Sequence, residues 1–91
     1  MHVKTVLSVL GKDRVGIVAA ISGALADSGA NIEDIRQTII GTIFSMTMLV
    51  TVDEDAASFE AVQTRLAEVG DELGMQVTLQ REDVFHFMHR I

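Results

Sequence analysis

The spacing of hydrophobic residues changes period along the chain, and each change predicts a new element. Segments with β-branched residues or strict alternation predict strands over residues 3–10, 32–40, 43–52 and 75–80. Between the first two strands, apolar residues at helical spacing predict a helix over residues 15–28. A second predicted helix follows the third strand, and one of its faces carries Phe59, Val62, Leu66, Val69 and Leu73. The tail, residues 83–91, predicts a short helix with an apolar side made of Val84, Phe87, Met88 and Ile91.

Residues typical of turns and helix ends mark the boundaries between these elements. Asp13 is expected to cap the first helix, and Gly29 is expected to end it in a left-handed conformation. The pair Gly41-Thr42 predicts a two-residue hairpin loop of type II′ between the second and third strands. The cluster Asp53-Glu54-Asp55 is expected at the start of the second helix, where acidic side chains favour the helix dipole. Gly74 ends that helix.

The order of elements is therefore βαββαβ followed by a tail, which predicts an α+β fold. Two βαβ halves with right-handed crossovers give one antiparallel sheet with both helices on one face, the ferredoxin-like plan. The other face of this sheet carries apolar residues among hydroxyl and charged ones, at Val6, Leu10, Ile40, Ile43 and Leu49. We expect something to cover part of that face.

Composition adds that the chain has more apolar residues than a small monomer needs. Its 91 residues, 48% of them hydrophobic, are expected to form one domain over residues 1–91, with residues 83–91 as its tail. A domain of this size buries only about 60–65% of the surface of its unfolded chain. A homodimer, or a larger homo-oligomer, that buries one face of the sheet accounts for the excess.

Charge and residue usage argue against several classes of partner. The chain has 13 acidic and 7 basic residues, the basic ones scattered, so nucleic acid is not an expected direct partner. Cysteine is absent, which removes disulfides, thiolate nucleophiles and cysteine-bound metals. The sequence has no signal-peptide pattern and no long apolar run, so we expect a cytoplasmic protein without a membrane partner.

The side chains that could carry chemistry do not predict an enzyme. There is no nucleophile elbow, and Asp53-Glu54-Asp55 resembles a solvated helix cap rather than a separated acid–base pair. His86 and His89 lie three apart on the predicted tail helix, a spacing that could place two imidazoles near one metal. Packing at the surface or at an interface is the stronger interpretation, because no third ligand is evident in the sequence. We expect no catalysis, no cofactor and no metal.

The most informative segment is the loop Gly11-Lys12-Asp13-Arg14-Val15-Gly16, which opens the first helix. Backbone amides at a helix N-terminus are unpaired and partly positive, so such a loop can receive a small anion, including a carboxylate. Asn31, or a carbonyl near it, could meet the ammonium group of an amino acid. Simpler roles stay open: turn geometry or close packing for the glycines, a helix cap for Asp13, solvated charges for Lys12 and Arg14, and a turn residue for Asn31.

These residues carry a resemblance to a known family. The element order, the loop Asp13-x-x-Gly16-Ile17-Val18 and the pair Asn31-Ile32 together resemble the ACT domain. The chain is more closely similar to the free-standing ACT proteins of the UPF0237 family, in four segments: Val9–Gly16, Asp34–Ile39, Phe44–Val50 and Gln80–Ile91. The Met-His-Arg-Ile ending is the most specific of these features, because the geometry of the fold does not require it.

The resemblance implies a regulatory module that usually binds an amino acid at the interface of a dimer. Its ligand contacts the loop after the first strand and the start of the second. Carried over to this chain, the candidate ligand-binding residues are Gly11, Asp13, Arg14, Val15, Gly16, Asn31 and Ile32. Many ACT domains have proline at the position of Val15, so the loop is expected to be less rigid here.

The predicted function is therefore that of a small-molecule sensor. A homodimer binds an effector, an amino acid, and relays its occupancy to a partner enzyme or transcription regulator. A ligand-free dimerisation or adaptor module, acting through the sheet face and the C-terminal tail, is the alternative.

Overall fold

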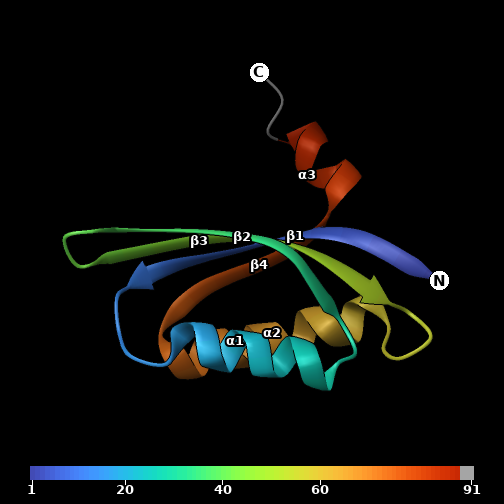
Figure 1. Ribbon diagram of the computed structural model, residues 1–91, viewed down its shortest axis with the longest axis horizontal. Coiled ribbons are helices and arrows are strands. Elements are labelled where there is room, and N and C mark those ends of the chain that lie inside the picture. Colours follow the sequence, from blue (N-terminus) through green and yellow to red (C-terminus); the bar gives the residue numbers. More distant parts are fainter. Residues whose placement is uncertain (89–91) are drawn as a thin grey trace.

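The computed structural model of the protein describes residues 1–88, which form one sheet with helices on both of its faces. The elements follow in the order β1 (His2–Lys12), α1 (Ile17–Asp27), β2 (Asn31–Ile40), β3 (Ile43–Asp53), α2 (Phe59–Leu73), β4 (Met75–Arg81) and α3 (Glu82–Met88). The strands pair antiparallel in the order β2-β3-β1-β4. Figure 1 shows α1 and α2 under the sheet and α3 on the opposite face. The predicted ferredoxin-like βαββαβ fold is confirmed.

A hydrophobic core fills the space between the sheet and the two longer helices. Alternate residues of β3 point into it, and the buried ones are Phe44, Met46, Met48, Val50 and Val52. Facing residues of the neighbouring strand and of both helices complete the cluster, among them Leu7, Val9, Ile21, Leu25, Val62 and Leu66. The period-two and helical patterns of the sequence therefore predicted the core correctly.

The first helix begins later than the sequence predicts. α1 starts at Ile17, and its N-cap is Gly16, which has a φ of 91°. The prediction that Asp13 caps this helix is wrong, because Asp13 directly follows the last residue of β1 and lies four residues before α1. Its backbone amide donates a hydrogen bond to the carbonyl oxygen of Thr42 at 2.7 Å.

The second helix also begins later, and its cap is a residue that the sequence interpretation missed. α2 starts at Phe59, and the Oγ of Ser58 accepts a hydrogen bond from the amide of Ala61 at 3.1 Å. The prediction that residues 53–55 open this helix is wrong, because Asp53 is the last residue of β3 and the next two residues belong to the turn that follows it. Glu54 still reaches the helix, since its Oε2 accepts a hydrogen bond from the amide of Phe59 at 3.3 Å.

The predicted turns agree with the structure. Gly29, with a φ of 71°, follows the end of α1, and Gly41, with a φ of 60°, opens the hairpin between β2 and β3. Among residues 1–88 only glycines have positive φ, so Thr42 does not, which is the pattern of a type II′ turn. In Figure 1 this hairpin turn projects beyond the ends of α1 and α2.

The sheet face opposite α1 and α2, called the outer face below, is partly covered. α3 follows β4 directly and packs against β1 and β4 there. Val6, which was expected on an uncovered surface, is only 3% exposed. The other apolar residues predicted for this face are exposed, namely Leu10, Ile40, Ile43 and Leu49.

Candidate functional site

The loop between β1 and α1 is pinned at two points. On one side, the amide of Asp13 is bound to Thr42 in the β2–β3 hairpin turn. On the other, Nη1 of Arg14 donates a hydrogen bond to the carbonyl oxygen of Leu73 at 3.2 Å. Leu73 is the last residue of α2, where free carbonyl groups give the helix a partly negative end that a guanidinium stabilises. The loop therefore has a defined position between two other elements.

The N-terminus of α1 presents unused backbone donors. The first helical hydrogen bond runs from the amide of Ala20 to the carbonyl oxygen of Gly16 at 3.0 Å, so the amides before Ala20 point out of the helix. Within residues 1–88, no side chain caps this end and its first turn contains no acidic residue. Glycine is needed at position 16, because a φ of 91° is strained for any residue with a side chain. This helix end has the electrostatics of an anion site.

The two glycines of the loop serve different purposes. A Cβ at Gly11 would overlap the Sδ of Met75 and lie 3.3 Å from the carbonyl oxygen of Gly74. Gly11 therefore leaves room for the side chain of Met75 at the start of β4, a packing role of the kind that the sequence left open. A Cβ at Gly16 would have no atom within 4 Å, so its requirement for glycine is conformational.

A hollow of about 390 Å³ adjoins the loop on the side of α2. It is lined by Lys12, Asp13, Arg14, Leu73 and Gly74. Val15, at 96% exposure, belongs to no described hollow and projects from the loop into solvent. Among the predicted loop residues, the structure thus brings Asp13 and Arg14 to one cavity and leaves Val15 and Gly16 beside it.

Asn31 and Ile32 do not share a site with the loop in a single chain. They pair with Thr51 and Val50 at one end of β3, whereas Gly11 pairs with Phe44 near the other end. At the rise of an antiparallel strand, the two ends lie roughly 24 Å apart. On the helical side of the sheet, α1 and the loops before and after it connect these two ends. Within one chain, the two halves of the predicted site therefore do not meet.

The start of β2 contains a bulge that the sequence did not reveal. The register of β2 on β3 shifts between Ile32 and Asp34, which leaves Glu33 as the extra residue. The side-chain amide of Asn31 donates a hydrogen bond to Oε2 of Glu33. A second hollow, of about 170 Å³, opens beside the bulge and is lined partly by Lys4, Glu33 and Glu82.

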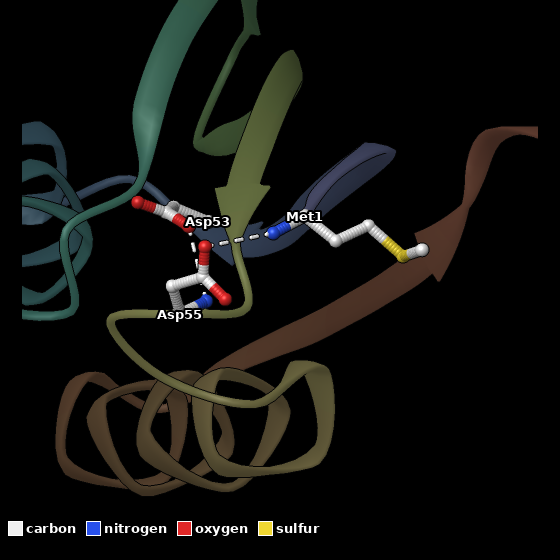
Figure 2. A network of polar contacts seen from close by, with 3 residues as sticks. All are labelled: Met1, Asp53 and Asp55. Carbon is white, nitrogen blue, oxygen red and sulfur yellow. Dashed lines mark hydrogen bonds and ion pairs between the residues drawn. The ribbon is translucent and has the colours of Figure 1, made fainter.

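The acidic cluster after β3 holds the N-terminus of the chain. Figure 2 shows the amino group of Met1 beside Asp55, whose Oδ2 lies at 3.0 Å. Asp53 orders the same turn, because its Oδ1 accepts a hydrogen bond from the amide of Asp55 at 3.0 Å. The hydrogen bond to Asp55 raises the pKa of the Met1 amine above its ordinary value of 8.0. Asp53 and Asp55 thus order the turn after β3 and hold the amino group of Met1.

The remaining candidates concern metals and membranes. His86 is exposed on α3, and His89 lies outside the described residues, so how the two imidazoles lie relative to each other is not described. In the described part of the chain, no group of three or more metal-binding side chains occurs. No helix within residues 1–88 is long and apolar enough to cross a membrane.

Comparison with known proteins identifies the family. The family model of the ACT domain matches residues 4–80. A UPF0237 protein of Methanocaldococcus jannaschii is 49% identical over 97% of this chain and 98% of its own length. A UPF0237 protein of Listeria innocua is 41% identical over 97% of this chain and 99% of its own length.

Solved structures agree with the fold. An ACT domain protein from Streptococcus pneumoniae has a TM-score of 0.77 and 32% identity, over 91% of this chain and 93% of that one. The regulatory subunit of aspartate kinase from Thermus thermophilus, in its ligand-free form, has a TM-score of 0.65 and 28% identity. That comparison covers 86% of this chain and 50% of the kinase subunit. Because the family model and these relatives cover nearly the whole chain, the chain belongs to the UPF0237 family as a single-domain ACT protein.

Proposed function

We propose that the protein is a regulatory module that binds an amino acid at the loop between β1 and α1. Membership of the ACT family points to a small-molecule regulatory role, and one similar solved structure is the regulatory subunit of aspartate kinase. The observation that carries the proposal is the N-terminus of α1, where a pinned loop presents amides that no described side chain caps. A ligand carboxylate at this end gains hydrogen bonds and the favourable helix dipole.

The proposed site needs two copies of the chain. β2 is an edge strand, and its own start, at Asn31, lies far from the loop of the same chain. Two β2 strands related by a two-fold axis run antiparallel, so the start of each one lies beside the end of the other. The end of β2 is next to the loop, because Ile39 pairs with Phe44 and Phe44 pairs with Gly11. A homodimer of this kind would place Asn31 and Ile32 of one copy near the loop of the other.

Within this site the groups have distinct roles. The amides that begin α1 receive the ligand carboxylate, and the side-chain oxygen of Asn31 or a carbonyl near it receives the ammonium group. Asp13 and Arg14 fix the loop through the hairpin and α2, and Val15 supplies an apolar surface at the edge of the site. This chemistry is binding alone, so we propose no enzymatic step. A bound ligand would favour one dimer geometry, which a partner enzyme or transcription regulator then recognises.

Isothermal titration of the protein with each of the twenty amino acids tests this proposal. We expect binding of one or a few of them with dissociation constants between about micromolar and millimolar, as befits a ligand of this size. Gly16→Ala should weaken that binding about tenfold, because a side chain at positive φ displaces the start of α1.

The matched control is Gly23→Ala, inside α1, where an added Cβ meets no atom within 4 Å. It should bind the same amino acid as tightly as the wild type. Titrations without heat across the whole panel would contradict the amino-acid proposal. Equal binding by wild type and Gly16→Ala would contradict the assigned site.

An adaptor function is the second candidate, and the outer face favours it. Exposed apolar residues remain there, including Leu10, Ile43 and Leu49, and Val84 of α3 is exposed as well. Removal of residues 82–91 should abolish capture of a protein partner if the adaptor function is correct. If the protein is a sensor, its capture of a partner should instead change when the amino acid that it binds is added.

A further inference from the structure

The outer face of the sheet is covered over only part of its area. α3 packs against β1 and β4 there. Figure 1 shows that, among residues 1–88, no element lies over the part of this face that runs out to the β2–β3 hairpin turn. This uncovered part, called the open region below, consists of three rows of paired residues: Ile40, Ile43 and Lys12; then Thr38, Ser45, Leu10 and Gln76; then Arg36, Thr47, Ser8 and Thr78.

Three large apolar side chains lie next to one another in the open region. Ile40 and Ile43 pair with each other directly before the hairpin turn. Leu10 is a diagonal neighbour of Ile43, because it pairs with Ser45 on the same strand. Ile40, Ile43 and Leu10 are 69%, 53% and 47% exposed. Exposed apolar side chains that adjoin one another, unlike scattered ones, are typical of a surface that another molecule covers.

The open region carries positive charge and no negative charge. Its charged residues are Arg36 and Lys12, and the others are hydroxyl, amide or apolar. Neither cation forms an ion pair with any residue that the structure describes. The first acidic residue of β2 on this face, Asp34, lies one row further along, opposite Leu49. In a chain with a net charge of −6, this region therefore attracts acidic groups that the rest of the surface repels.

α3 indicates which kind of segment the outer face accepts. This helix begins with Glu82 and Asp83 and continues with Val84 and Phe85, so it combines acidic with apolar residues. A further strand would need a free edge of the sheet for its hydrogen bonds, whereas a face of the sheet packs against a helix. The segment that suits the open region is therefore a helix with apolar and acidic side chains.

We propose that the open region docks an amphipathic helix of a partner protein. The apolar stripe of this helix covers Leu10, Ile40 and Ile43. Acidic side chains beside the stripe meet Arg36 and Lys12. This proposal specifies the partner surface of the proposed function, for sensor and adaptor alike, and it does not depend on the amino-acid site.

Two features make this surface suitable for reading the state of the protein. Lys12 also lines the hollow beside the loop between β1 and α1, so a docked helix would lie close to the proposed ligand site. Pairing of two β2 edges would leave the open region accessible, because an edge contact lies in the plane of the sheet. A second copy of the chain suits the region less well, since its own open region would add two cations and no acid.

Two designed peptides of about 15 residues, long enough for a helix of several turns, test the docking surface. Both carry leucine along one stripe of the helix. The first has glutamate on each side of the stripe, and the second has lysine there. Titration followed by backbone amide NMR should show that the glutamate peptide binds and shifts signals of the open region. The lysine peptide should bind at least tenfold more weakly, and added salt should weaken the glutamate peptide.

Variants separate the charged contacts from the apolar ones. Arg36→Glu should weaken binding of the glutamate peptide about fivefold and strengthen binding of the lysine peptide, because it reverses the charge beside the stripe. Leu10→Thr keeps a residue suited to a strand but removes apolar area, so it should weaken the glutamate peptide about fivefold.

The matched controls are Arg65→Glu, an exposed reversal on α2, and Ile39→Thr, an exposed position on β2 that faces the helical side of the sheet. Both variants should bind the glutamate peptide like the wild type. The docking surface is wrong if neither peptide binds, or if the shifted signals gather on α1 and α2. It is also wrong if Arg36→Glu and Leu10→Thr bind the peptide as tightly as the controls.

Two further results would assign the open region to another occupant and overturn the proposal. Cosedimentation with phosphatidylglycerol vesicles, without binding of either peptide, would indicate a lipid surface. A smaller sedimenting mass for Leu10→Thr than for the wild type, in analytical ultracentrifugation, would indicate a second copy of the chain. Peptide binding beside silent amino-acid titrations would contradict the sensor function alone, and amino-acid binding without peptide binding would contradict the docking surface alone.

Discussion

Gly16 shows how one residue can decide the start of a helix. Its φ of 91° ends the loop and lets α1 begin without a capping side chain. Sequence reasoning assigned the cap to Asp13 because Asp is a frequent N-cap residue. The structure instead uses the backbone of Asp13 to extend the β1–β3 ladder. Whether such an Asp caps the helix or bonds to a neighbouring strand depends on where that strand ends. The local sequence around the Asp does not contain this information.

The loss of stability caused by a side chain at Gly16 can be compared with the effect of the same substitution at Gly23, which does not have a positive φ. Gly16→Ala should lower the free energy of unfolding by about 1–2 kcal/mol, because it forces a side chain into the left-handed region. Gly23→Ala should raise the same quantity by about 0.5–1 kcal/mol, because alanine favours the helix and has space there. Urea unfolding of both variants would check this, and equal stability of the two would contradict the conformational argument.

At the scale of elements, the sequence predicted strands better than helix starts. The alternation in β3 and the Gly41-Thr42 pair predicted a strand and a turn that the structure confirms. The start of α2 was misplaced because acidic side chains favour a helix N-terminus, and three of them occur together at residues 53–55. In the structure, Asp53 and Asp55 hold a turn and the N-terminus, and Ser58 caps the helix. Competition of this kind is decided by tertiary contacts.

The role of Ser58 predicts a specific loss of stability. Ser58→Ala removes the acceptor of the Ala61 amide and should lower the free energy of unfolding by about 1 kcal/mol. Thr64→Ala, at an exposed position within α2, should instead leave stability unchanged or slightly higher. Thermal unfolding would compare the stability of the two variants with that of the wild type. A Ser58→Ala protein as stable as the wild type would show that Glu54 is sufficient to hold this helix end.

At the scale of the whole molecule, the candidate site could be predicted only in part. The loop was identified by its glycines and by its place before a helix, and the structure explains both glycines. The distance between this loop and Asn31 follows from sheet topology, and the bulge at Glu33 has no signature in the chain. The contact between Arg14 and Leu73 joins residues far apart in sequence, so no local pattern could reveal it.

The ion pair between the Met1 amine, just before β1, and Asp55, just after β3, predicts that the stability of the fold depends on pH. Folding raises the pKa of the Met1 amine above 8.0, so the ion pair with Asp55 stabilises the fold fully below pH 8.0. This stabilisation is lost as the pH rises through the pKa of the folded state. Asp55→Asn should therefore reduce the fall in unfolding free energy above pH 8.0, whereas Asp71→Asn on α2 should not. Identical pH profiles for Asp55→Asn and the wild type would contradict this role of the pair.

The double attachment of the loop carries a mechanical consequence. Asp13 is tied to the turn of a projecting hairpin, and Arg14 is tied to the last residue of α2. Any displacement of this short connection therefore moves two other elements at once. A protein touching either the hairpin turn or the end of α2 could detect an event at the loop without ever contacting what caused it.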